Sequence, residues 1–213
     1  MIGQLRDKVK NSFLILAKPF AFFKIHPNIV SFLGIPLALI SAYFILQNDF
    51  TFALIFAILA VTMDMIDGSV AKLLNKTSNF GNYFETMIDK VVEVILIAPF
   101  VILYPLPAFL AISFSLIASY AKPRVALVII TDNRDWPAIG EHGDRLLLLL
   151  IGMLISIFYP VINSIPIMEL VLYLIFATTL IGTVQRISYG KKLIEDAEKN
   201  ETLLPYIKEK RDR

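Results

Sequence analysis

Long apolar tracts alternate with short polar connections along this chain. The tract from Asn28 to Gln47 runs for twenty residues without a charge, which is the length that a helix needs to span a bilayer. The same pattern, followed to the end of the chain, predicts six spanning helices near residues 28–47, 51–74, 81–104, 107–131, 142–160 and 167–190. We therefore expect an all-α integral membrane protein with six transmembrane helices.

The two ends of the chain differ from this apolar middle. Apolar residues between Ile2 and Phe20 recur at helical spacing with lysines and arginines among them, which is typical of an amphipathic helix in the headgroup plane. An amphipathic helix packed on protein has the same pattern. Residues 191–213 are polar and predict a cytoplasmic helix with a loose tail. The expected organisation is an interfacial juxtamembrane helix over 1–25, a six-helix transmembrane domain over 26–190 and a cytoplasmic tail over 191–213.

The composition is typical of a membrane protein and argues against several other classes of protein and site. Hydrophobic residues make up 57% of the chain and charged residues only 18%, whereas soluble domains carry about 45–50% and about 25%. A net charge of +2 is too small to indicate a nucleic-acid partner. The absence of cysteine excludes disulfides and thiolate metal sites, and His26 and His142 cannot form a zinc site alone.

The lysines and arginines predict the orientation in the membrane. All 20 lie near the two termini or in and beside the segments 72–90 and 122–145, and the connections near Asn48, Pro105 and Pro160 contain none. The positive-inside rule then places both termini, and any site on that side, in the cytoplasm; we expect the plasma membrane. A soluble helical bundle, the alternative, would carry cations along every helix.

Acidic residues interrupt the apolar tracts at informative intervals. Asp64 and Asp67 are three residues apart, and Glu85 and Asp89 are four apart, so each pair shares one helix face. Because a charge in the bilayer costs about 2.5–3.5 kcal/mol, four acids converging near the cytoplasmic surface require a compensating partner. Salt bridges with nearby lysines are the structural alternative. Glu93 lies deeper on the face of Asp89, and we expect it to be structural.

Divalent cations are the partner that this donor set favours. All available ligands are oxygens, which suit Mg²⁺, Mn²⁺ or Ca²⁺, and two such ions held by four acids are suited to transfer at phosphorus. Gly68, Ala71 and Gly81 are small enough for a bulky ligand to approach. Lys72 is placed to reach a phosphate, and Ser78 is placed either to contact the ligand or to cap a helix.

These residues resemble the signature of a known family. The stretch DMIDGSVAK from Asp64 to Lys72, eight residues, and GNYFETMID from Gly81 to Asp89 match the CDP-alcohol phosphotransferase (CDP-alcohol phosphatidyltransferase) pattern D-x-x-D-G-x-x-A-R, eight residues, G-x-x-x-D-x-x-x-D. Two positions depart from it. Lys72 replaces the usual Arg, and Glu85 replaces the third Asp, and both keep the charge.

The resemblance implies a fold, a reaction and a set of residue roles. Family members transfer a substituted phosphate from a CDP-linked donor to an alcohol, release CMP, and resemble one another in forming homodimers. It implies two Mg²⁺ or Mn²⁺ ions per site, with Asp64, Asp67 and Glu85 on one metal and Asp89 helping to hold the second and acting as general base. The implied CDP-binding residues are Asn28, Asp64, Asp67, Gly68, Ala71, Lys72, Ser78 and Gly81.

Cations in the second half of the chain indicate the acceptor. Arg186 interrupts an apolar run, and a costly cation there suggests an anionic partner. Together with Lys122, Arg124 and Arg145, it is similar to the residues of inositol-phosphate-accepting members, which act on CDP-diacylglycerol or its archaeal ether counterpart, CDP-archaeol. Each cation could instead be a headgroup or helix-end anchor. We therefore expect a phospholipid synthase that accepts inositol phosphate.

Three alternatives to this function stay open. Glycerol phosphate would also need a cationic pocket, whereas serine as acceptor would leave these cations without a phosphate. An ion or proton transporter that uses intramembrane carboxylates is the alternative from another class. A transporter predicts acids spread through the depth of the bilayer, rather than gathered near one surface beside glycines.

Overall fold

The computed structural model describes residues 13–130, 136–137 and 139–204. The first part of the expected N-terminal amphipathic helix, with Ile2 and the other residues before Phe13, lies outside the described residues. The chain forms two compact units. Unit 1 comprises Met1–Leu103 with Ser156–Phe158, and unit 2 comprises Tyr104–Ile155 with Tyr159–Arg213.

Unit 1 is a group of antiparallel helices that begins with the apolar helical segment Phe13–Phe22. Its longer helices start where the sequence supplies a cap. The Nδ1 atom of His26 accepts a hydrogen bond from the amide of Asn28 over 3.3 Å, and Asp49 accepts one from the amide of Phe52 over 3.2 Å. Such caps satisfy amides that have no partner within the helix. The helices that follow are α2 (Pro27–Leu46), α3 (Phe50–Leu73), α4 (Asn79–Ile97) and α5 (Pro99–Leu103).

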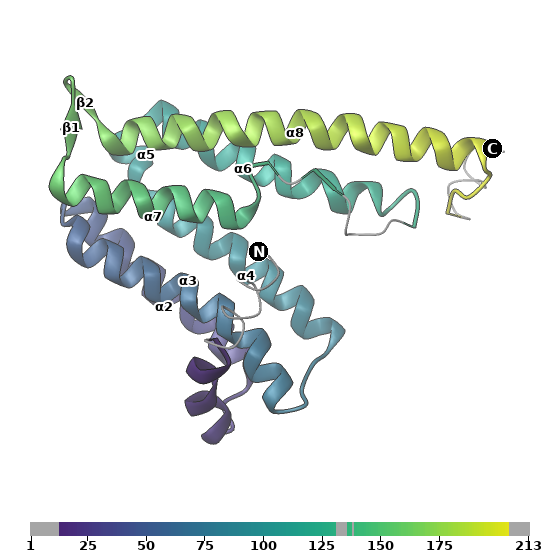
Figure 1. Cartoon of the computed structure of the whole chain (residues 1–213), viewed down its shortest axis with the longest axis horizontal. Coiled ribbons are helices and arrows are strands. Elements are labelled where there is room, and N and C mark those ends of the chain that lie inside the picture. Colours follow the sequence, from purple (N-terminus) through teal and green to yellow (C-terminus); the bar gives the residue numbers. More distant parts are fainter. Residues whose placement is uncertain (1–12, 131–135, 138, 205–213) are drawn as a thin grey trace, which may run out of the picture. The chain divides into compact units, whose positions relative to one another are not determined.

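Small side chains let the helices of unit 1 lie close together. Helix α2 packs along α3 and against α4, as the ribbons in Figure 1 show. Ala53, Ala57 and Ala60 of α3 are fully buried, and small residues at helix contacts allow backbones to approach in membrane proteins. At Gly34 of α2, a Cβ atom would lie 3.2 Å from Val92 of α4. The close approach of α4 to α2 and α3 is what positions the acidic residues.

The helix expected over 81–104 is divided in two. Helix α4 ends at Ile97 and α5 begins at Pro99. Proline has no amide hydrogen and crowds the preceding turn, so Pro99 accounts for the break.

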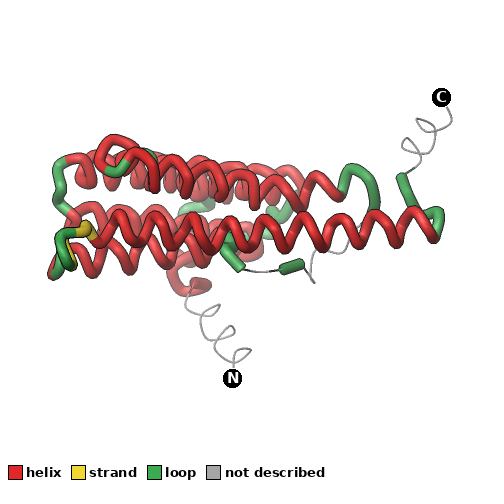
Figure 2. The backbone as a smooth tube through the Cα atoms, turned by 90° about the horizontal axis from the view of Figure 1, so that it is seen from above, coloured by secondary structure: helices red, strands yellow, loops and turns green. Residues whose placement is uncertain are grey.

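Unit 2 contains two long helices, a shorter helix and a small hairpin. Helix α6 (Pro105–Val125) ends six residues before the expected boundary at 131, after Pro123 within its last turn. The two-residue strands β1 (Val161–Ile162) and β2 (Ile165–Pro166) pair antiparallel and connect α7 to α8, where Figure 2 shows them in yellow. The helices after α6 are α7 (His142–Phe158) and α8 (Ile167–Lys199).

Aromatic and close-packed contacts hold unit 2 together. Phe114 of α6 and Phe176 of α8 meet edge to face, with ring centroids 5.0 Å apart. A Cβ atom at Gly152 of α7 would lie 2.8 Å from Val171 of α8, so α7 also lies directly on α8. Near the end of α8, Trp136 is buried with Val125 and three other apolar residues, Ile129, Ala197 and Leu203.

Four helices within the described part of the chain are long and apolar enough to cross a membrane. They are α2, α3, α6 and α8. Helix α7 has 17 residues, and α4 carries the acidic residues of the signature; neither belongs to this group of four. The fold is therefore mostly helical with four candidate spans.

Candidate active site

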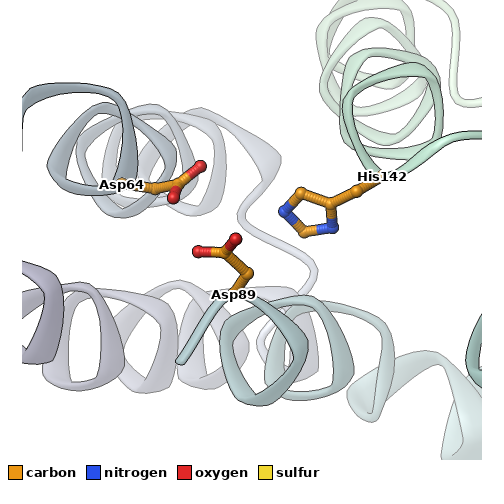
Figure 3. Close-up of side chains that lie close together, drawn as sticks. All are labelled: Asp64, Asp89 and His142. Carbon is orange, nitrogen blue, oxygen red and sulfur yellow. The ribbon is translucent and has the colours of Figure 1, made fainter. Parts of the chain in front are cut away.

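The carboxylates of the acidic motif gather within unit 1. Asp64 and Asp67 on α3 and Glu85 on α4 each offer an oxygen, and these oxygens all lie within 4.8 Å of one another. Asp89, one turn after Glu85, has an oxygen within 4.8 Å of one from Asp64. Figure 3 shows the side chains of Asp64 and Asp89 directed toward each other from their two helices. The juxtaposition expected from the i,i+3 and i,i+4 spacings is therefore present.

The connection between α3 and α4 sets this arrangement. Asn75 takes a left-handed backbone conformation with φ of 51°, which is tolerated by asparagine, and it turns the chain after α3. Ser78 then accepts a hydrogen bond from the amide of Gly81 over 2.9 Å and caps α4. Of the two roles foreseen for Ser78, the structure shows the helix cap.

A cavity of about 270 Å³ lies beside the carboxylates, bounded by α2, α3, α4 and the connection between α3 and α4. Seven of the eight residues predicted to bind CDP line it, and Asp64 is the exception. Glu85 lines it as well, so the cavity and the acidic cluster share two carboxylates. The lining residues are Pro27, Asn28, Ser31, Asp67, Gly68, Ala71, Lys72, Lys76, Thr77, Ser78, Gly81, Asn82 and Glu85.

Gly68 leaves space inside this cavity. A Cβ atom built at Gly68 would meet no heavy atom within 4 Å among the described residues. Gly81 is closer to its surroundings, since its Cβ atom would lie 3.1 Å from the hydroxyl of Ser78. The absence of a side chain at Gly68 therefore serves the cavity, because no neighbouring helix occupies that place.

Asp67 is the most enclosed carboxylate of the cluster. It is 2% exposed, and its Oδ2 atom accepts a hydrogen bond from the hydroxyl of Ser31 on α2. Its Oδ1 atom accepts one from the amide of Gly68. Donors that stabilise a buried carboxylate lower the cost of its charge.

Sequence reasoning missed five residues that line the cavity. Pro27, Ser31, Lys76, Thr77 and Asn82 lie outside the invariant positions of the signature. Lys76, Thr77 and Asn82 had a usable signal, since they are polar and adjoin the signature in sequence. Ser31 had none, because a serine within an apolar helix more often bonds to its own helix.

Glu93 has a partner that its sequence position did not reveal. The residue is 2% exposed, and Lys90, one turn before it on α4, places its Nζ atom 3.3 Å from Glu93 Oε2. This partly buried ion pair agrees with the expected structural role.

The acidic cluster fits a divalent cation by chemistry and by distance. Mg²⁺ binds oxygen ligands at about 2.0–2.1 Å, so two oxygens on opposite sides of the ion lie about 4.2 Å apart. The oxygens of Asp64, Asp67 and Glu85 lie within a 4.8 Å limit. A set of three carboxylates without sulfur ligands suits Mg²⁺ or Mn²⁺.

Unit 2 holds the cations predicted to bind the acceptor phosphate, and two of them are buried. Arg145 is 1% exposed. It donates from Nη1 to the carbonyl of Gly140 over 2.6 Å and from Nη2 to the hydroxyl of Ser119 over 3.4 Å. It therefore ties the start of α7 to α6.

Arg186 is bound in a similar way. It donates from Nη1 to the carbonyl of Ala118 over 2.7 Å and from Nε to that of Pro137 over 3.3 Å, and its Nη2 atom lies 3.7 Å from Glu141 Oε1. A guanidinium has five N–H donors, so these contacts do not exhaust it.

The other two cations lie on α6. The Nζ atom of Lys122 lies 6.0 Å from the ring centroid of Trp136, within the range of a cation–π contact. Arg124 and Arg186 line one open groove of about 480 Å³ between α6 and α8. The structure thus brings Arg124 and Arg186 to the same groove.

Comparison with known proteins finds a family and relatives whose similarity extends over most of this chain. Residues 24–185 match the family model described as CDP-alcohol phosphatidyltransferase. Archaetidylinositol phosphate synthase from Pyrococcus horikoshii is 28% identical over 201 residues, which cover 92% of this chain and 99% of that protein. An uncharacterized protein from Aquifex aeolicus is 23% identical over 184 residues, covering 83% and 87% of the two chains.

Solved structures with the same fold come from Mycobacterium tuberculosis phosphatidylinositol phosphate synthase. The structure with CDP-DAG bound has a TM-score of 0.69 at 19% identity, covering 84% of this chain and 92% of that one. The complex of the same synthase with manganese and citrate has a TM-score of 0.69 at 19% identity, covering 84% and 88%. At this identity the likeness establishes the fold, and the family match covers most of the chain. The chain therefore belongs to the CDP-alcohol phosphatidyltransferase family and is a membrane phosphotransferase.

Proposed function

We propose that this enzyme transfers a phosphatidyl-type group from CDP-diacylglycerol or CDP-archaeol to inositol phosphate and releases CMP, as a step in phospholipid biosynthesis. The observation that carries the proposal is the cavity of unit 1, where Asp67 and Glu85 lie beside Gly68, Ala71 and Lys72. Acids, a cation and unfilled space suit a metal-bound pyrophosphate. Family membership favours this transfer over the transporter alternative.

Two divalent cations, Mg²⁺ or Mn²⁺, are the proposed cofactors. Asp64, Asp67 and Glu85 would hold one, and Asp89 would help to hold the second. When bound, the cations would neutralise the pyrophosphate and stabilise CMP as leaving group. The spacing of the carboxylate oxygens and the manganese complex of the mycobacterial synthase support this assignment.

The remaining lining residues would enclose the CDP group. Gly68, Ala71 and Gly81 would admit it closely, and Asn28 and Ser78 would flank it from α2 and from the connection between α3 and α4. Lys72 would place a point charge on a phosphate. It cannot form the bidentate fork of the arginine usual at this position.

Asp89 is the proposed general base. Its carboxylate would take the proton of the acceptor hydroxyl as that oxygen bonds to the lipid-linked phosphorus and the bond from phosphorus to CMP breaks. An alcohol is a poor nucleophile at neutral pH, and a positioned base contributes typically about 10²–10⁴-fold. The proximity of Asp89 to Asp64 (Figure 3) supports a place beside the metal-binding carboxylates.

Lys122, Arg124, Arg145 and Arg186 are the proposed acceptor-phosphate residues. The groove shared by Arg124 and Arg186 supports the role of these two. The name of the Pyrococcus relative supports inositol phosphate over glycerol phosphate. The contacts of Arg145 and Arg186 with carbonyl groups show that both also hold unit 2 together.

The proposed setting is a homodimer in the plasma membrane with six spans per chain and with both termini and the active site in the cytoplasm. Helices α4 and α7 would complete the six, and the lysine and arginine distribution supports the orientation. The three proposed regions are 1–25, 26–190 and 191–213. Helix α8 continues through residue 190 to Lys199, so the last boundary marks a change from apolar to polar sequence within one helix.

A CMP-release assay with a panel of acceptors tests the function. The purified enzyme would receive CDP-diacylglycerol or CDP-archaeol, Mg²⁺, and either inositol phosphate, glycerol phosphate, inositol or serine, with the lipid product identified by mass spectrometry. We expect release with inositol phosphate at least tenfold above that with any other acceptor. Faster release with glycerol phosphate would assign the enzyme to the alternative subgroup.

A further inference from the structure

A hydrogen bond links α2 to the acidic cluster. Ser31 is 5% exposed and donates its hydroxyl proton to Oδ2 of Asp67, which lies 36 residues later on α3. Both side chains are buried. No feature of the family signature includes Ser31, and the function proposed above gives it no role.

The hydroxyl of Ser31 has two acceptors within reach but only one proton. The carbonyl of Pro27 lies 3.3 Å away, which is longer than the usual range for an O–H donor. Asp67 is the closer acceptor, and a hydrogen bond to a carboxylate in its ionised form is about twice as strong as one to a neutral carbonyl. The proton therefore belongs to Asp67, and the contact with Pro27 is secondary.

The second oxygen of Asp67 is also engaged. Its Oδ1 atom accepts the amide hydrogen of Gly68 on the same helix, so each oxygen carries one donor. Two donors from different directions fix the plane of a carboxylate. Each oxygen keeps a further lone pair, and one oxygen of Asp67 lies within 4.8 Å of oxygens from Asp64 and Glu85.

We propose that Ser31 is a positioning residue, which orients Asp67 so that its free lone pairs meet a divalent cation shared with Asp64 and Glu85. This inference rests on the metal site of the proposed function. Groups that orient metal ligands in this way are commonly worth about 10–100-fold in metal affinity. In this role Ser31 acts through Asp67 and is not itself a ligand of the cation.

The test measures Mn²⁺ affinity of the full-length protein in detergent without lipid substrate, by titration calorimetry or by the electron paramagnetic resonance signal of free Mn²⁺. Ser31→Val and Ser31→Thr form a matched pair, because the two new side chains have the same branching and differ only where a methyl group of valine is a hydroxyl group in threonine. We expect Ser31→Val to bind Mn²⁺ about 10–100-fold more weakly and Ser31→Thr to bind within about threefold of wild type. Equal affinity for the two variants would overturn the proposal.

Ser41 supplies a control on the same pair of helices. It is fully buried on α2 and donates to the carbonyl of Ala53 on α3 over 2.8 Å, but it lies ten residues from Ser31. Ser41→Ala removes a comparable bond between α2 and α3, so it should lower thermal stability and leave Mn²⁺ affinity unchanged. A loss of affinity in Ser41→Ala as large as that in Ser31→Val would show a general effect of packing and overturn the role of Ser31.

Two further measurements distinguish the positioning role of Ser31 from direct contact with nucleotide and from a failure of the metal site itself. Because Ser31 also lines the cavity, direct contact with nucleotide predicts weaker CDP binding by Ser31→Val in EDTA, whereas positioning predicts no change there. Asp67→Asn tests the metal site itself. If Asp67→Asn loses Mn²⁺ affinity while Ser31→Val keeps it, the metal site stands and the positioning role fails. If both keep it, the metal site fails as well.

Discussion

Arg186 of α8 donates a hydrogen bond from Nη1 to the main-chain carbonyl of Ala118 in α6, over 2.7 Å. The same guanidinium reaches the carbonyl of Pro137 and the carboxylate of Glu141. It thus joins two helices to the segment before α7, while Arg186 also lines the groove of unit 2. Two consequences of its removal can be measured separately.

We predict that Arg186→Ala lowers both stability and acceptor use. The loss of partners for buried carbonyls should cost about 1–3 kcal/mol, seen as a lower melting temperature in detergent. If the guanidinium also binds the acceptor phosphate, the KM for inositol phosphate should rise at least tenfold while the KM for CDP-lipid stays near wild type. Equal rises in the two KM values would show a purely structural residue.

Glu141→Gln is the matched control for Arg186. It removes the ion pair of 3.7 Å but leaves the guanidinium and its carbonyl partners in place. Because Glu141 is half exposed, with 52% of its side chain accessible, the effect on stability should be under about 1 kcal/mol. Acceptor KM should be unchanged.

Asp89→Asn should abolish turnover while the protein stays folded. The amide keeps the shape of the side chain but cannot accept the hydroxyl proton, and we expect CMP release to fall by about 10²–10⁴-fold. The measurement is single-turnover CMP release, with melting temperature as the check on folding. Turnover within threefold of wild type would remove Asp89 from the role of base.

Glu93→Gln gives the comparison for Asp89. Glu93 is also an acid of α4, but it pairs with Lys90 at 3.3 Å. We expect Glu93→Gln to lower the melting temperature and to retain CMP release within a fewfold of wild type. A large loss of turnover in a folded Glu93→Gln protein would contradict the structural role of Glu93 and the distinction drawn between it and Asp89.

Gly68→Ala should raise the stability of the protein and weaken its binding of CDP-lipid. Alanine favours a helix over glycine by about 1 kcal/mol, and the added Cβ atom meets no described atom within 4 Å. That Cβ atom would enter the cavity where we place the CDP group, so the KM for CDP-lipid should rise at least tenfold. An unchanged KM would mean that the ligand does not approach Gly68.

Gly182→Ala on α8 should behave in the opposite way. A Cβ atom there would lie 2.1 Å from the carbonyl oxygen of Ile139, so the backbone must move, and overpacking of this kind costs about 1–3 kcal/mol. The melting temperature should therefore fall. If the melting temperature of Gly182→Ala equalled that of Gly68→Ala, the result would contradict the close contact of Ile139 with α8.

The acidic cluster was predictable because it depends on local geometry. Asp64 and Asp67 share a helix face by spacing alone, as do Glu85 and Asp89. Because the connection between α3 and α4 is short, the two helices must lie antiparallel. Glycine and alanine beside the acids marked the ligand side. The break at Pro99 was missed, because one helix was expected over 81–104, although proline disfavours the preceding helical turn.

The rest depends on contacts between distant segments. Ser31 meets Asp67 only because α2 packs on α3, and one serine in an apolar run gives no sign of that partner. The carbonyl groups bound by Arg186 belong to Ala118 and Pro137, and a main-chain carbonyl has no residue type that sequence could reveal. A buried arginine therefore suggested an anionic ligand, where the structure shows several partners within the protein.

The most direct test of the account is CMP release from CDP-lipid with inositol phosphate, measured in EDTA and after addition of Mg²⁺ or Mn²⁺, for wild type and for Asp67→Asn. The carboxylate cluster of Asp64, Asp67 and Glu85 predicts no release in EDTA, full recovery of the wild type with either cation, and little recovery of Asp67→Asn. Release by the wild type that is indifferent to chelation, or full recovery of Asp67→Asn, would contradict the account.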